Sequence, residues 1–226
     1  MEYVIVYGLT ILSLIITMGA QAYINSSYSK YSKVNNKKGI TGSEAAREIL
    51  DKNGFEDIKV VETQGTLTDH YDPKNKVIRL STNIYRDSSI ASVSVAAHEC
   101  GHAIQDKKGY IFLRIRHSLI PVVNLCSYAG YLVIVLGAIF SLLGLIWIGI
   151  AAEMVILVFQ LVTLPVEFDA SKRGLSEIKK NEFLDSKEVK DGRTMLTAAA
   201  LTYVASVAAA VIQILRLALI YGRRDR

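Results

Sequence analysis

The chain has 226 residues, enough for one or two domains, and 51% of them are hydrophobic. Its net charge of +5 comes from 26 basic residues scattered among 21 acidic ones, with no basic face interleaved with aromatic residues, which argues against a nucleic-acid partner. Two cysteines, Cys100 and Cys126, are too few for a disulfide framework, so nothing indicates an oxidising compartment.

The first apolar run covers residues 3–24 and is long enough to cross a bilayer as a helix. A cleaved signal peptide is the alternative, because Ala20-Gln21-Ala22 resembles a cleavage site. However, the start carries Glu2 and no basic residue, and the run is longer than the core of a signal peptide. A retained transmembrane helix is therefore the favoured interpretation.

A polar segment of residues 25–118 follows, and it is large enough for a small folded domain. Thr41 and Glu44 form a capping box that predicts a helix over residues 42–52, ended by Asn53-Gly54. Short strands are predicted at residues 58–62 and 76–80, with turn-forming residues at 72–75. From residue 89 to about 107 the pattern is helical. The segment is thus predicted to be a small α+β domain.

Two further apolar runs, residues 119–143 and 145–164, predict a transmembrane helical hairpin that turns at 141–144. A polar segment at 171–194 precedes a last apolar run, 196–221, which is the weakest because it contains Arg216. The sequence therefore predicts an α-helical integral membrane protein with about four transmembrane helices.

With four spans, both polar segments lie on one side of the membrane. Basic residues crowd the ends of the spans on that side: Lys30, Lys33, Lys37, Lys38, Arg114, Arg116, Lys172, Arg173 and Arg193. The positive-inside rule makes this side cytoplasmic. Arg223, Arg224 and Arg226 would then lie on the other side, against the rule.

The chemistry is indicated by an HExxH motif at residues 98–102. On a helix, His98 and His102 are four residues apart and face one point, where two imidazole nitrogens are good ligands for Zn²⁺. Glu99 is turned away from that point and could take a proton from a water that attacks a carbonyl. Two surface histidines without a metal are the alternative. The motif predicts a zinc metallopeptidase with Glu99 as the general base.

A catalytic zinc needs a third protein ligand. The downstream candidates are Glu153, Glu167, Asp169 and Glu177, and Glu167 is preferred because it follows the third span on the side of the motif helix. Asp169 or Arg173 could support a ligand or bind a substrate carboxylate, unless they only form a solvated helix end. Glu153 lies in mid-span, where it could face a polar cavity, be protonated or be paired.

Three other residues, in the polar segment or inside the motif, carry groups that can take part in chemistry. His70 or Tyr71 could stabilise an oxyanion, although a turn residue satisfied by its neighbours is the plainer interpretation of His70. Cys100 points away from the ligand face and is expected to be a small packing residue.

The chain resembles the YugP-type neutral zinc metallopeptidases of bacterial membranes over essentially its full length. The resemblance is carried by residues 67–73 (LTDHYDP), 98–105 (HECGHAIQ) and 164–171 (LPVEFDAS). More distantly, the chain is similar to membrane gluzincins such as the CAAX prenyl endopeptidases, in which a Glu opening an ExxxD stretch is the third ligand. This resemblance implies a zincin-like domain, a bacterial plasma membrane and Glu167 as ligand. The Asp of ExxxD falls on Ser171 here, so Asp169 is expected to substitute.

These observations together predict a first transmembrane helix (1–24), a polar zincin-like domain with the motif helix (25–118), a transmembrane hairpin (119–166), a polar segment with the third ligand (167–195), and a fourth transmembrane helix with a basic tail (196–226). The expected activity is hydrolysis of membrane or membrane-proximal proteins, with substrate paired to an edge strand at 77–80. Two alternatives stay open: a motif inside the bilayer, which its polar neighbours disfavour, and a non-catalytic scaffold with structural zinc that recruits a membrane partner.

Overall fold

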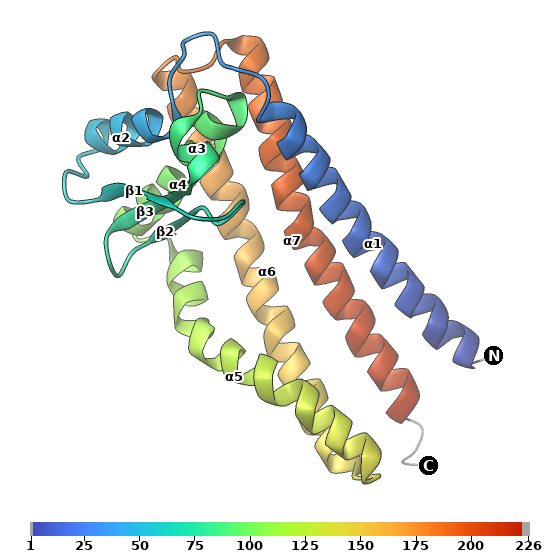
Figure 1. Cartoon of the computed structure of the whole chain (residues 1–226). Helices are drawn as coiled ribbons and strands as arrows, with labels where there is room; N and C mark the ends of the chain where they lie inside the picture. The colour runs from blue at the N-terminus through green and yellow to red at the C-terminus, as the bar shows by residue number, and fades with distance from the viewer. Residues whose placement is uncertain (1, 223–226) are drawn as a thin grey trace. The chain divides into compact units, whose positions relative to one another are not determined.

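A computed structural model describes residues 2–222 of the chain, and its elements are labelled in Figure 1. The basic tail residues Arg223, Arg224 and Arg226 lie outside this range. The elements are α1 (Glu2–Tyr31), α2 (Gly42–Lys52), β1 (Lys59–Thr63), β2 (His70–Asp72), β3 (Val77–Ser81), α3 (Thr82–Arg86), α4 (Ile90–Lys107), α5 (Ile111–Ile139), α6 (Leu143–Lys180) and α7 (Ser186–Tyr221). The predicted class, a helical membrane protein with a small α+β region, is confirmed.

The chain forms two compact units. The first, here called the apolar unit, consists of Met1–Gln21, Arg114–Leu164 and Leu201–Arg226. The second, the polar unit, consists of Ala22–Leu113 and Pro165–Ala200. The candidate chemistry lies entirely in the polar unit.

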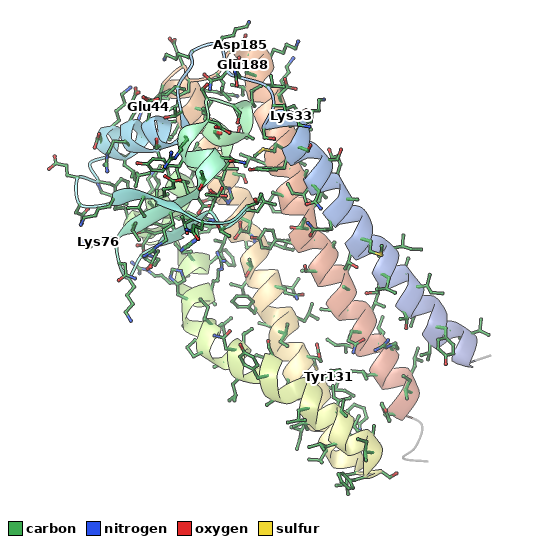
Figure 2. All side chains as sticks on the ribbon, viewed as in Figure 1. Lys33, Glu44, Lys76, Tyr131, Asp185 and Glu188 are labelled. Carbon is green, nitrogen blue, oxygen red and sulfur yellow. The ribbon has the colours of Figure 1, made fainter. Side chains whose placement is uncertain are left out.

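The apolar unit contains the long apolar stretches of α1, α5, α6 and α7, the four described helices that are long and apolar enough to cross a membrane. Large hydrophobic side chains are exposed on them, and Tyr131 projects outward from α5 (Figure 2). Such exposure is costly in water and favourable in lipid. Arg216, the charged residue of the weakest span, donates from Nη1 to Thr10 Oγ1 over 3.0 Å. The predicted count of four spans is confirmed.

The polar unit begins with the predicted capping box. Thr41 Oγ1 accepts from the Glu44 N–H and the Glu44 carboxylate accepts from the Thr41 N–H, so α2 starts and ends at the predicted residues. Its three-stranded sheet has the order β1-β3-β2, with β3 parallel to β1 and antiparallel to β2. The prediction that residues 77–80 form an edge strand is therefore wrong. β3 is central because the short strand β2, which the sequence analysis missed, covers its second side.

The motif helix α4 is the centre of the polar unit. Ser89 caps its first turn by accepting from the Ser92 N–H, and most of its residues are buried. The second half of α6, predicted as a polar segment, continues as a helix to Lys180 and packs directly against α4. A Cβ on Gly101 would lie 2.3 Å from the carbonyl oxygen of Ala170, and one on Gly174 would lie 2.7 Å from that of Ala97. The two backbones can approach this closely because both positions are glycine.

Candidate metal centre

The close contact of α4 and α6 brings three metal-ligating side chains together. His98 Nε2 lies 3.3 Å and His102 Nε2 lies 3.7 Å from Glu167 Oε2, and one donor atom from each residue falls within 4.8 Å of the others. Glu167 and His102 are buried, and His98 is mostly buried. No other group of three or more His, Cys, Asp or Glu residues with this spacing occurs in the part of the chain that the structure describes.

The donor set fits zinc. Tetrahedral Zn²⁺ with bonds of about 2.0–2.1 Å to nitrogen and oxygen holds its ligand atoms about 3.3 Å apart, close to the two distances observed here. Two imidazoles and one carboxylate are also the ligands of catalytic zinc sites that keep a fourth position for water or substrate. A structural zinc site usually has four protein ligands, and the described residues supply three.

The His102 side of the centre is held by a buried amide. The Gln105 side chain is fully buried, and its Nε2 donates to the carbonyl of Val166 over 2.8 Å and to Asp169 Oδ2 over 2.9 Å. Because both amide hydrogens are used in this way, Oε1 is left to accept from His102 Nδ1 at 3.0 Å. A proton on Nδ1 leaves the Nε2 lone pair free for a metal. Asp169 also accepts from Arg173 Nε, which extends the network by one more residue.

The His98 side is supported differently. His98 Nδ1 lies 3.1 Å from Ser171 Oγ, which occupies the position of the Asp in the ExxxD pattern. A hydroxyl there can accept the Nδ1 hydrogen and orient the ring, although it carries no charge. Asp169 does not contact either histidine directly among the described contacts. It acts on His102 through Gln105, so the expected substitution of Asp169 for Ser171 is wrong.

Glu99 lies beside the three ligands without joining them. Its Oε2 accepts from the backbone N–H of Tyr71 on β2 over 2.9 Å, and the residue is buried. Burial raises the pKa of Glu99 to about 7, and the neighbouring His98 opposes that rise. A carboxyl group that titrates near neutral pH is suited to accept and return a proton.

The remaining candidates lie outside the cluster. Asp169 and Glu177 contact other side chains, and Glu153 lies on the part of α6 that belongs to the apolar unit. His70 is exposed, and its Nδ1 contacts the Thr68 carbonyl at 2.8 Å, as expected for a residue satisfied by its neighbours. Cys100 is fully buried, its thiol faces the Ala46 carbonyl, and burial raises its pKa, so it is a packing residue as predicted.

Comparison with known proteins agrees with this geometry. Residues 6–222 match the family described as "Putative neutral zinc metallopeptidase". The chain belongs to this family. It is 44% identical over 213 residues to the "Putative membrane protease YugP" of Bacillus subtilis (strain 168), covering 94% of this chain and 95% of that protein. No solved structure matches the chain significantly.

Membership of this family confirms the predicted resemblance, the class of hydrolase and the cofactor zinc. The long apolar helices, together with the membrane protease as relative, make the chain a membrane protein.

Proposed function

We propose that the chain is a membrane endopeptidase in which His98, His102 and Glu167 hold zinc and Glu99 is the general base. The observation that carries this proposal is the convergence of the three donor atoms, 3.3 and 3.7 Å apart, beside a buried carboxylate that is not part of the cluster. Zinc in this position supplies Lewis acidity, which polarises the scissile carbonyl and makes a water molecule more acidic.

Glu99 moves the proton in both halves of the reaction. It takes a proton from the attacking water while the water oxygen bonds to the carbonyl carbon of the scissile peptide. It then gives that proton to the amide nitrogen, and the C–N bond breaks to leave a carboxylic acid and an amine. The second proton of the water passes from the new carboxyl group to the amine, which gives a carboxylate and an ammonium group. The buried hydrogen bond of His102 to Gln105 and the partly buried one of His98 to Ser171 hold the imidazoles in the tautomer that this chemistry needs.

The substrate is proposed to bind in extended form along the outer edge of β2. The backbone N–H of Tyr71 already points toward Glu99, and the N–H and C=O of one strand residue point to the same side. An added strand there would place its backbone next to the general base. Proteins embedded in or close to the membrane are the proposed substrates, and the basic residues on this side make the cytoplasm the proposed location of the site.

Substitution of Glu99 by Gln tests the proposal. The full chain, purified in detergent and loaded with zinc, is incubated with a proteome-derived peptide library, and new termini are counted by mass spectrometry. Removal of the base is expected to lower hydrolysis by about 10²–10⁴-fold while zinc content stays unchanged. Glu56→Gln makes the same change at an exposed position and should cleave like the wild type. Equal cleavage by the Glu99→Gln variant and the wild type would refute Glu99 as the general base, and no cleavage by the zinc-loaded wild type would favour a scaffold.

A further inference from the structure

A second feature of the polar unit is a cavity of about 500 Å³ between α6 and α7. Six lining residues repeat along one face of α6 at the helical spacing, and two come from α7 one turn apart. The lining consists of Phe168, Ser171, Lys172, Leu175, Ser176 and Lys179 of α6, and Arg193 and Thr197 of α7.

The cavity carries uncompensated positive charge. Three of its lining residues are basic, Lys172, Lys179 and Arg193, and none is acidic. All three are exposed, and no ion pair of theirs occurs among the described residues. The cavity is therefore built to receive an anion.

A larger neighbouring cavity of about 910 Å³ shares Lys179 and Arg193 with the first one. It differs from the first cavity because acidic residues also line it. There, the carboxylates of Asp185, just before α7, and Glu188, in the first turn of α7, already have hydrogen-bond or ion-pair partners (both residues are labelled in Figure 2). Asp185 pairs with the Lys37 ammonium over 2.5 Å, and Glu188 accepts from the backbone N–H groups of Lys37 and Asp185. The three acidic residues that line this larger cavity, Glu182, Asp185 and Glu188, are matched in number by the three basic ones that it does not share, Lys37, Lys38 and Lys190. They therefore leave the charge of the shared Lys179 and Arg193 in excess.

The position along the two helices identifies the source of the anion. The apolar run of α6 ends at Leu164, four residues before Phe168, which is about 6 Å of helical rise. Thr197 likewise lies four residues before Leu201, the first α7 residue of the apolar unit. A lipid has a charged headgroup and acyl chains, which match a basic pocket that follows directly on apolar helix. We propose that this cavity binds the phosphate headgroup of an anionic membrane lipid.

Occupation of the cavity would also act on the metal centre. Ser171 lines the cavity, and its hydroxyl lies 3.1 Å from His98 Nδ1. A phosphate next to Ser171 would compete for or reinforce that hydrogen bond. This consequence rests on the proposed function: hydrolysis should depend on anionic lipid, whereas lipid binding itself does not require hydrolysis.

Native mass spectrometry of the full, zinc-loaded chain in non-ionic detergent tests the proposal. The protein is titrated with phosphatidylglycerol and, separately, with phosphatidylcholine of the same acyl chains. The wild type is expected to retain one phosphatidylglycerol with about 100-fold preference. A variant with Lys172→Gln, Lys179→Gln and Arg193→Gln should lose that preference, since each basic residue contributes about fivefold near an anionic lipid surface.

The matched control removes the same charge elsewhere. Lys33→Gln, Lys74→Gln and Lys187→Gln change exposed residues that do not line the cavity, and this variant should keep the preference. Lys172→Arg, Lys179→Arg and Arg193→Lys keep the charge and should also keep it. Zinc content of every variant reports that the polar unit is folded.

Four results would overturn the proposal. Equal retention of the two lipids would show that the chain has no site for an anionic headgroup. A preference for phosphatidylglycerol that survives neutralisation of the three basic residues would show that the cavity is not that site. Displacement of phosphatidylglycerol by millimolar inorganic phosphate identifies free phosphate as the ligand, and displacement by polyglutamate identifies an acidic peptide. Because lipid retention is measured without hydrolysis, its failure leaves the peptidase proposal standing, and unchanged cleavage by the Glu99→Gln variant leaves the lipid site standing.

Discussion

The two sides of the metal centre are built in different ways. His102 is held by Gln105, which is fully buried and uses its amide on three partners, with Asp169 and Arg173 behind it. His98 is held by a single hydroxyl, Ser171, which also faces a cavity.

This difference determines which side of the metal centre is rigid. A buried polar group that loses its partner costs much more than one that water can reach. The His102 side therefore has a fixed geometry, because no solvent can replace Gln105. The His98 side can adjust, since water or an occupant of the cavity can take the place of Ser171. Substitutions on the two sides should accordingly have unequal effects.

Gly101→Ala is expected to have the largest effect, because it separates both histidines from Glu167 at once. The new Cβ would lie 2.3 Å from the Ala170 carbonyl, so α6 must move away from α4. We expect loss of zinc and about 1–3 kcal/mol of stability, measured by metal analysis and thermal unfolding in detergent. In the control variant Gly144→Ala, on α6, the new Cβ meets no atom within 4 Å, so this variant should retain zinc. Full zinc in the Gly101→Ala variant would contradict the close packing described here.

Gln105→Leu should break the His102 side alone. It leaves His102 Nδ1, the Val166 carbonyl and Asp169 without their buried partner. Zinc affinity is expected to fall about 10–100-fold, as for other residues that orient a metal-binding histidine. Competition with a chelator of known affinity measures it, and Gln64→Leu at an exposed position is the control. An affinity equal to that of the wild type would show that Gln105 does not position His102.

Ser171→Ala should have the smallest effect, a fall in zinc affinity of less than about tenfold, because solvent can reach the His98 side. Ser171→Asp tests the same side of the centre in the opposite direction. It places a carboxylate behind His98, as in the ExxxD pattern, and is expected to raise zinc affinity above that of the wild type in the same chelator assay. The asymmetry would be disproved by a Ser171→Ala variant that loses more affinity than Gln105→Leu.

Local patterns explain how much the sequence could predict. The helical spacing of His98 and His102 and the capping box at Thr41 depend on neighbouring residues only, so they were visible without tertiary structure. Glu167 could be predicted as the third ligand because it comes directly after a recognisable span and opens the stretch that corresponds to the ExxxD pattern of the family. Gln105 was missed, although its position three residues after His102 places the two on one helix face.

Other parts depend on contacts between distant segments. Strand β2 has only three residues of polar composition, so its sequence shows no alternating pattern that would predict a strand. Its existence depends on pairing with β3. The approach of Gly101 to Ala170 joins residues from two helices, and a lone glycine in a helix does not reveal its partner. The error about the edge strand follows from the same cause, because strand order is a property of the assembled sheet.

Zinc content of the detergent-purified chain tests the central claim most directly, with wild type measured beside Glu167→Ala and Glu153→Ala. We expect near-stoichiometric zinc in the wild type and in the Glu153→Ala variant, and loss of zinc from the Glu167→Ala variant. Zinc retained in full by the Glu167→Ala variant, or absent from the wild type, would contradict the assignment of His98, His102 and Glu167 as the metal ligands.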